Sequence, residues 1–367
     1  MGIFYMARKR DIPDFDPDFS SLDGFVRSMN DAAPYLTDFS IGEITLGRLR
    51  RLAVSKVRDS YYHSFEIPKK SGGTRTITAP GGELKKVQTV LAYILDYVYL
   101  VPSPVMGFVP ERSVATNAAQ HVGRSYVLNI DLKDFFPSVK RHMIAGVLKK
   151  YDVDRDVANL VLRLCCRTPE GGGEDCLPQG APTSPVLSNI ACTCLDIRLS
   201  GLAQSTGLTY TRYADDITFS SDHNVYRDEG PFWSKLRSIT AECGFTINEK
   251  KTRLLRPWDR QEVTGVTVNS KVNVSRKYLK NLRAELHQMQ YRDVSKEDWL
   301  RVMGKVNYVR MVRHSQMEGL EDYRSDCLID YVQALRCKMR LGVLPEYLLS
   351  LSSLLKSLDD MDPVFHY

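Results

Sequence analysis

The sequence predicts an α+β protein, because short runs of β-branched and apolar residues alternate with longer segments that carry an apolar face at helical spacing. Of its 367 residues, 43% are hydrophobic, 10% aromatic and 26% charged, which is typical of a globular protein and excludes a disordered or fibrous chain. At this length we expect about two or three packed units.

Charge and cysteine content restrict the cellular setting. Fifty basic and 44 acidic residues give a net charge of +6, which permits a nucleic-acid partner without requiring one. No apolar stretch approaches the ~18 residues of a bilayer span, so we expect a cytoplasmic protein with no membrane partner. The eight cysteines should stay reduced, and Cys165, Cys166 and Cys176 have no His at ligand spacing that would favour a metal site.

The N-terminal third predicts helices around a basic hairpin. Residues 11–40, rich in Asp and broken by proline, are expected to form a loose extension leading into short helices. Residues 41–60 have the pattern of an amphipathic helix, and 62–68 that of a strand. Gly72 and Gly73 then mark a tight turn into a β-branched strand.

The remaining elements follow from the same two periodicities. We expect helices over 84–100, 117–121, 141–151, 157–167, 185–199 and 232–243, and a basic, mostly helical tail from Lys277 onward. We expect strands over 126–132, 253–255 and 263–268, and two short strands within 210–220 that fold back at Ala214 and Asp215.

Three aspartates occupy positions where a charge is costly unless it binds something. Asp131 closes the apolar strand YVLNIDL, and Asp215 and Asp216 lie at the tip of the hairpin TRYADDITF. Converging carboxylates bind cations that prefer oxygen, and two Mg²⁺ ions about 3.5–4 Å apart would activate a 3′ hydroxyl and stabilise a departing pyrophosphate. This arrangement predicts nucleotidyl transfer, unless the Asp pair serves only the backbone conformation of a turn.

The order of four motifs decides between these alternatives. They are NIDLKDFFPSV (129–139), LPQGAPTSPVLSN (177–189), RYADD (212–216) and GFTINEKKT (244–252). Together they resemble the successive palm motifs of reverse transcriptases, over roughly residues 62 to 268. Two further signatures, NAAQH (117–121) and VTG (263–265), resemble those of bacterial retron reverse transcriptases.

The resemblance implies a right-hand polymerase fold with basic fingers, a palm of a small antiparallel sheet plus helices, and a helical thumb. It divides the chain into an N-terminal extension (1–40), fingers and palm (41–268), and a helical thumb with a C-terminal segment (269–367). Basic and aromatic residues interleave after Lys277, which suits RNA binding by a thumb. The alternative is an amphipathic helix bundle whose aromatics fill its core.

The resemblance also implies the catalytic residues. Asp131 and Asp215 would be the principal ligands of two Mg²⁺ ions, with Asp216 as the third catalytic carboxylate and the Leu132 carbonyl as a further metal ligand. Lys251 would protonate the pyrophosphate leaving group, although the lysine before it is an alternative.

Nucleotide and RNA contacts are implied in the same way. Phe136 would lie under the incoming sugar and clash with a ribose 2′-OH, unless it is a core residue, as we expect for Phe135. An arginine fork suits a triphosphate, and a glycine lets the backbone approach a nucleotide, although LPQG could be a plain turn. The nucleotide-binding set is Lys69, Lys70, Arg75, Phe136, Gln179 and Gly180, and the RNA-binding set is Asn117, His121, Val263, Thr264 and Gly265.

The implied activity is DNA synthesis from dNTPs on a cognate structured noncoding RNA, started from an internal 2′-OH and giving a branched RNA–DNA molecule, msDNA. The family implies anti-phage defence with an effector protein. About fifty residues after the thumb are too few for a nuclease, so host ribonuclease H would remove the template. The alternatives are a diversity-generating or CRISPR-linked reverse transcriptase, and a noncatalytic RNA-binding scaffold.

Overall fold

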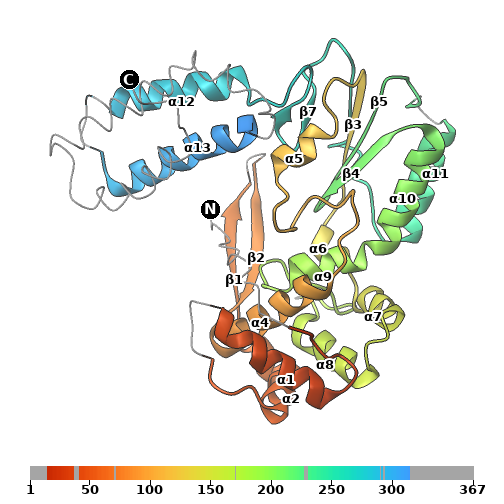
Figure 1. Ribbon diagram of the computed structural model, residues 1–367, viewed down its shortest axis with the longest axis vertical. Coiled ribbons are helices and arrows are strands. Elements are labelled where there is room, and N and C mark those ends of the chain that lie inside the picture. Colours follow the sequence, from red (N-terminus) through yellow and green to blue (C-terminus); the bar gives the residue numbers. More distant parts are fainter. Residues whose placement is uncertain are drawn as a thin grey trace.

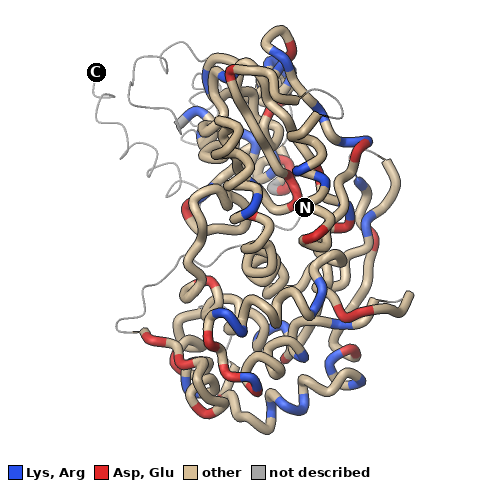
Figure 2. Tube along the Cα trace, turned by 90° about the vertical axis from the view of Figure 1, so that its right-hand side faces the viewer, with Lys and Arg blue, Asp and Glu red and all other residues tan. Residues whose placement is uncertain are grey.

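The computed structural model describes residues 15–36, 41–69, 72–169, 171–226, 230–289, 291 and 294–314, and Lys70 lies outside them. The α+β class is confirmed: small antiparallel sheets are packed with helices, and helices α12 (Arg276–Met289) and α13 (Lys296–His314) lie to one side (Figure 1). Lys and Arg are scattered over the height of the molecule in the view of Figure 2, so charge alone does not mark a binding face.

Four antiparallel strands form the central sheet, in the order β4-β5-β3-β6. Leu128 and Phe219 lie opposite each other on the middle strands and are fully buried, because helices cover this part of the sheet. Helix α10 contacts both β4 and α11, which places these two helices along the flank of the sheet (Figure 1). The strands are β3 Tyr126–Asp131, β4 Thr209–Tyr213, β5 Asp216–Ser221 and β6 Arg253–Leu255.

The helices around the sheet agree with the sequence pattern except at one break. The helix expected over 185–199 is two helices, α9 and α10, which meet at 51° around Cys192. The Thr193 hydroxyl donates to the Ile190 carbonyl at 2.7 Å and so competes with the helical backbone at the break. The helices are α4 Gly82–Val98, α7 Arg141–Lys150, α8 Arg155–Cys165, α9 Ser184–Ala191, α10 Thr193–Thr206 and α11 Pro231–Glu242.

Among the residues that the structure describes, no single helix is long and apolar enough to cross a membrane, and the bent pair α9–α10 reaches that length and apolar character only when the two helices are taken together.

Much of the expected N-terminal extension belongs to the main core. Helix α1 (Leu22–Ala32) packs on α4 and contributes Phe25 and Met29, which are both fully buried. The Ser21 side chain caps this helix by accepting from the Gly24 N–H at 3.1 Å. The 3₁₀ turn η1 (Ala33–Tyr35) follows it. The description of this region as loose is therefore wrong for residues 15–36.

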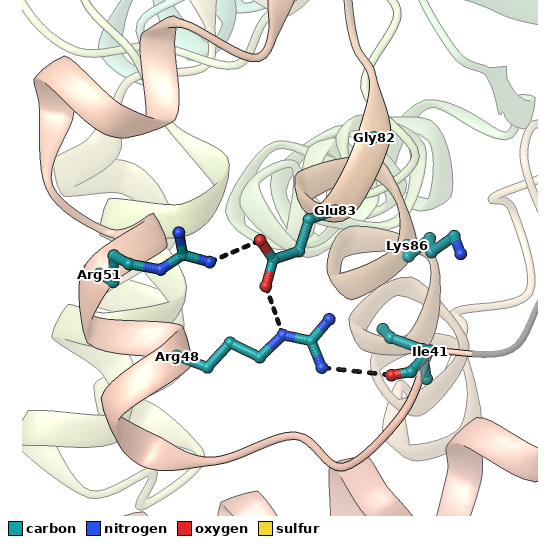
Figure 3. A pocket seen from close by; sticks show the side chains of 6 residues that line it. All are labelled: Ile41, Arg48, Arg51, Gly82, Glu83 and Lys86. Atoms are coloured by element: carbon teal, nitrogen blue, oxygen red, sulfur yellow. Dashed lines mark hydrogen bonds and ion pairs between the residues drawn. The ribbon is translucent and has the colours of Figure 1, made fainter.

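The helix expected over 41–60 is also split, into α2 (Leu46–Leu52) and α3 (Ser55–Asp59). A pocket of about 630 Å³ lies between α2 and the start of α4 (Figure 3). Glu83 points into it and pairs with Arg48 and Arg51. Partial burial acts to raise the pKa of Glu83, but hydrogen bonds from both arginines lower it below its usual range. The pocket's arginines thus fasten two helices together.

A second core lies apart from the first and contains the thumb helices. It joins helix α5 (Val114–Ala119) to β7 (Glu262–Val263), β8 (Val266–Thr267) and the helices α12 and α13. The strand expected over 263–268 is therefore a hairpin. Trp299 is 2% exposed in this core, which supports the alternative that aromatic residues pack inside the helices, whereas Tyr291 is 76% exposed.

Candidate active site

The end of β3 and the tip of the β4–β5 hairpin bring the three carboxylates together. Asp131, the last residue of β3, lies directly opposite Asp216, the first residue of β5. The N–H of Leu132 donates to the Asp215 carbonyl at 3.0 Å, so all three aspartates belong to one junction of strands. The fold-back at Ala214 and Asp215 is confirmed, and Ala214 takes a left-handed φ of 57° there.

Asp131 is held by two side chains of the GFTINEKKT motif. Lys251 Nζ donates to Oδ1 at 2.6 Å, and Asn248 Nδ2 donates to Oδ2 at 2.9 Å. The Asn248 N–H also donates to the Asp131 carbonyl at 2.7 Å, which anchors the motif on the end of β3. Lys251 is thus the lysine of this motif that reaches Asp131. The sequence did not lead us to Asn248, although an uncharged amide within a charged motif was an available signal.

Burial and neighbouring carboxylates raise the pKa values of Asp215 and Asp216. Loss of hydration, followed by the charges of Asp215 and Asp131, raises the pKa of Asp216 to about 7. Loss of hydration is also the main reason that the pKa of Asp215 is raised, while the charges of Lys251 and Arg75 act in the opposite direction. Further positive charge at this junction is therefore favourable.

The donor set suits a hard divalent cation, because it consists of carboxylate oxygens. An ammonium already contacts Asp131 Oδ1, which shows that this oxygen accepts a cation. In the part of the chain that the structure describes, no three or more His, Cys, Asp or Glu side chains are grouped tightly enough to hold a metal ion. A cation bound here would compete with Lys251 for the Asp131 carboxylate.

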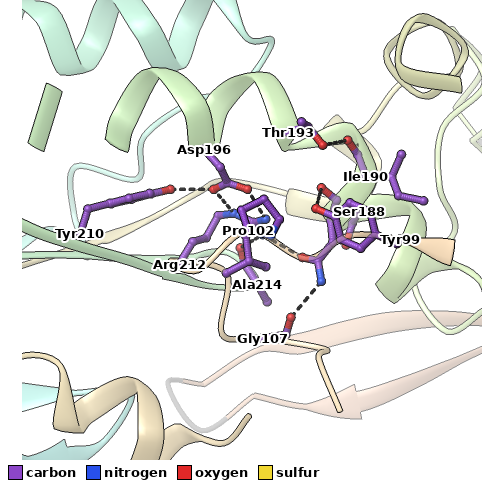
Figure 4. Close-up of polar contacts among 12 residues, drawn as sticks. Tyr99, Pro102, Gly107, Ser188, Ile190, Thr193, Asp196, Tyr210, Arg212 and Ala214 are labelled. Carbon is purple, nitrogen blue, oxygen red and sulfur yellow. Dashed lines mark hydrogen bonds and ion pairs between the residues drawn. The ribbon is translucent and has the colours of Figure 1, made fainter. Parts of the chain in front are cut away.

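A fully buried ion pair lies beneath the hairpin tip (Figure 4). Arg212 and Asp196 are 0% and 1% exposed, and Nε and Nη2 of the arginine donate to the two carboxylate oxygens at 2.7 Å each. The Tyr210 hydroxyl donates to the same carboxylate at 2.7 Å. Arg212 Nη1 donates to the Ala214 carbonyl at 3.2 Å, so the ion pair supports the backbone just before Asp215.

Sequence reasoning missed this ion pair, although an arginine inside the buried strand TYTRY was an available signal. The LPQGAPTSPVLSN motif contributes to the same support. Asn189 Oδ1 accepts from Arg212 Nη1 at 3.1 Å, and its Nδ2 donates to the Gly107 carbonyl at 2.9 Å. A Cβ at Gly107 would lie 2.4 Å from the Ala214 nitrogen, so only glycine lets the chain pack against the hairpin here.

The predicted basic hairpin forms from β1 (Tyr62–Pro68) and β2 (Thr74–Pro80). The Lys69 N–H donates to the Gly73 carbonyl at 3.0 Å and closes the turn. Arg75 lies on β2 opposite Ile67, and its charge acts to lower the pKa of Asp215 against the larger effect of lost hydration.

The LPQG turn is packed on this hairpin. The Thr78 N–H donates to the Gln179 carbonyl at 2.7 Å. Gly180 has a φ of 125°, and a Cβ there would lie 2.8 Å from Ile77 Cγ2. The glycine is therefore required both for its conformation and for close packing, and Gln179 lies beside the fingers hairpin.

The two phenylalanines after β3 differ in burial. Phe135 is 6% exposed and stacks on Phe245, with ring centroids 5.9 Å apart, so its assignment to the core is confirmed. Phe136 is only partly buried and lies 5.9 Å from the Phe108 ring. Both belong to the short helix α6 (Phe135–Ser138) that follows Asp131.

His121 of the NAAQH signature is buried against the central sheet. His121 is 0% exposed, and its ring nitrogens share hydrogen bonds with Ser220 Oγ at 2.7 Å and Thr211 Oγ1 at 2.8 Å. Burial, and then the charge of Arg124, lowers the pKa of His121 to about 3, so the ring is neutral at physiological pH.

Asn117 joins the NAAQH signature to the VTG turn. It is 1% exposed and donates to Thr264 Oγ1 at 3.4 Å. Thr264 and Gly265 form the two-residue β7–β8 turn with φ of 48° and 81°, the conformation of a type I′ hairpin. Val263 is fully buried and Gly265 is exposed. The sequence did not predict that Asn117 and His121 point inward, while Gln120 between them is exposed.

Residues 67–290 match the family model described as reverse transcriptase (RNA-dependent DNA polymerase). The chain belongs to this family. Retron Mx65 reverse transcriptase of Myxococcus xanthus is 38% identical over 337 residues, which cover 86% of this chain and 76% of that protein. Retron Ec86 reverse transcriptase of Escherichia coli is 35% identical over 277 residues, which cover 70% of this chain and 84% of that protein.

These relatives place the chain among the bacterial retron reverse transcriptases, so the enzyme is an RNA-directed DNA polymerase with nucleic acids, RNA included, as partners. Among solved structures, a foamy viral protease–reverse transcriptase bound to double-stranded DNA aligns with a TM-score of 0.39 at 17% identity, over 68% of this chain and 36% of that chain.

Proposed function

We propose that this reverse transcriptase copies a structured noncoding RNA of its own retron, starting at an internal 2′-OH and leaving a branched RNA–DNA molecule, msDNA. The observation that carries the proposal is the junction of Asp131, Asp215 and Asp216 with Lys251, in a chain that is 38% identical to a retron enzyme. Copying of a different template by a diversity-generating or CRISPR-linked system is the alternative.

Asp131, Asp215 and Asp216 would hold two Mg²⁺ ions, with the Leu132 carbonyl as a further oxygen ligand. When bound, the ions would activate the attacking hydroxyl and stabilise the departing pyrophosphate. Lys251 Nζ contacts Asp131 Oδ1 at 2.6 Å, so it lies close enough to give a proton to a leaving group at this junction. Asn248 keeps the orientation of the Asp131 carboxylate through its second oxygen.

The dNTP would lie between the fingers hairpin and the carboxylates. Arg75, with Lys69 and Lys70 near the turn, would bind its triphosphate, and the partly exposed Phe136 would reject a ribose 2′-OH. Gln179 and Gly180 would contact the template or sugar from the turn that packs on β2. The hydrogen bond between the Thr78 N–H and the Gln179 carbonyl supports this, because it joins the two binding segments.

Asn117, His121 and the VTG turn would contribute to recognition of the noncoding RNA. Since Asn117 and His121 are buried, we propose that they act by holding α5 and the β7–β8 turn in position, with Gly265 exposed at the tip. The further partners we propose are host ribonuclease H, which would remove the RNA template, and a retron effector protein in anti-phage defence.

The test is to purify the protein from its native operon and sequence the copurifying nucleic acid before and after ribonuclease treatment. We expect one DNA joined through a 2′ branch to one structured RNA. Asp215→Asn should abolish it, whereas Asp134→Asn, a matched change at an exposed carboxylate near the site, should not. Heterogeneous linear cDNA would instead support the alternative system, and nucleic acid made equally by Asp215→Asn would support a noncatalytic scaffold.

A further inference from the structure

The loop between β6 and β7 displays a tryptophan that the polymerase site does not use. Trp258 is 75% exposed, whereas the other two tryptophans of the chain, Trp233 and Trp299, are 7% and 2% exposed. An indole ring left in water forgoes a large gain from burial, so its exposure at a fixed position suggests a partner.

Hydrogen bonds fix the shape of this loop. The Arg256 N–H donates to Asp259 Oδ2 at 2.9 Å, and the Asp259 N–H returns a bond to the Arg256 carbonyl at 3.0 Å. Asn269 Nδ2 donates to the Asp259 carbonyl at 2.9 Å, and the buried Gln261 ties the loop to the Ser125 carbonyl at 3.0 Å. Trp258 is thus presented by a closed, anchored turn, so little conformational freedom would be lost on binding.

The charge around the ring favours nucleic acid over protein. The Arg256 guanidinium lies 5.8 Å from the centre of the Trp258 ring, and Arg253 is exposed on the adjoining strand. Within the described residues, neither guanidinium has a carboxylate partner, whereas Arg260 pairs with Glu262. An aromatic face beside unpaired guanidinium groups can stack a base and bind its phosphate at the same time.

We propose that Trp258 and Arg256 form a binding site for an unpaired base of single-stranded RNA, outside the catalytic cleft. In the sheet, Arg253 of β6 lies opposite Asn129 of β3, and Leu255 lies opposite Val127. The loop after Leu255 therefore lies beyond the Tyr126 end of β3, roughly 17 Å of strand from Asp131 at the other end. The site rests on the proposed function and deepens it. One part of a folded noncoding RNA would bind at this end of the palm sheet while another part is copied at the carboxylates.

The test uses the full-length protein and its own tryptophan fluorescence, since only one of its three tryptophans is exposed. A single-stranded adenosine dodecamer RNA should quench the emission, and a 12-base-pair RNA duplex should quench it far less. Trp258→Phe should remove the quenching, and Trp258→Ala should weaken binding by about fivefold to 150-fold. Arg256→Gln should reduce the slope of the log binding constant against log salt concentration by about the contribution of one phosphate contact. Tyr151→Ala, at another exposed aromatic, should change nothing.

Equal affinity of Trp258→Ala and wild type for the dodecamer, or quenching that survives Trp258→Phe, would overturn the proposal. So would a Trp258→Ala protein that binds RNA normally but no longer binds a protein partner, because the loop would then be a protein-docking site. Extension of an ordinary primer on an RNA template should be unchanged in Trp258→Ala. Failure of wild type in that extension would count against the polymerase function alone, which separates the two results.

Discussion

Phe136 is the residue that we propose to exclude ribonucleotides. We expect Phe136→Ala to raise the efficiency of ribonucleotide incorporation, relative to that of deoxynucleotides, by about tenfold or more. Removal of the ring opens space for a 2′-OH. Single-nucleotide insertion with dNTP and rNTP in competition measures this ratio. Phe135→Leu, in the buried neighbour, should lower stability and keep the selectivity. A Phe136→Ala enzyme that still excludes ribonucleotides would show that the gate lies elsewhere.

His121 makes the stability of the fold depend on pH. Its pKa is about 3 in the folded protein because of burial, against an ordinary value near 6.5. Between these values the unfolded chain binds a proton that the folded chain does not, so this contribution is complete above pH ~6.5 and is lost as pH falls. By pH 5 the loss amounts to about 2 kcal/mol of unfolding free energy.

Urea denaturation at pH 7.5 and pH 5 tests this. The drop in unfolding free energy between the two values should shrink by about that amount in His121→Gln, whereas the exposed His223→Gln should keep the full drop. Identical drops in wild type and His121→Gln would contradict the burial of a neutral imidazole between Ser220 and Thr211.

At the scale of elements, the β4–β5 hairpin depends on a charge in helix α10. Asp196→Asn would leave the Arg212 guanidinium buried beside a neutral amide, which should cost about 3–5 kcal/mol of unfolding free energy. Glu242→Gln is the matched control. It removes an exposed ion pair with Arg198, which lies on the same helix as Asp196, and should have little effect. Thermal unfolding of both variants measures the difference, and an unchanged midpoint for Asp196→Asn would refute the dependence.

The elements that the sequence predicts well are those with a periodic or local signal. The strands and turn that carry Asp131, Asp215 and Asp216 lie where the alternation of residues and the motifs place them. The partners of these elements leave no such signal. Asp196 is 16 residues from Arg212 and Asn248 is 117 residues from Asp131, so only the tertiary fold brings them together. For the same reason the inward direction of His121, which lies just after the end of α5, could not be predicted.

At the scale of the whole molecule, two hydrophobic cores support different parts of the enzyme. The first core extends from Phe15 to Ile247 and supports the sheet with its carboxylates. The second joins the thumb helices to α5 and reaches the sheet through Val127 on β3. Helix α13 contacts α5, and α5 contacts β4, so α5 lies between the thumb helices and the sheet of the palm.

During synthesis, helix α5 is made well before the segments that cover it. Its apolar residues Ala115 and Ala118 belong to a core whose other members begin at Val127 and then resume only at Val263 and continue to Val312. At ribosomal speeds of about 5–20 residues per second, that helix waits on the order of ten seconds or more for its cover. The palm is thus complete in sequence before the thumb can close over α5, so the apolar face of α5 stays uncovered during that interval.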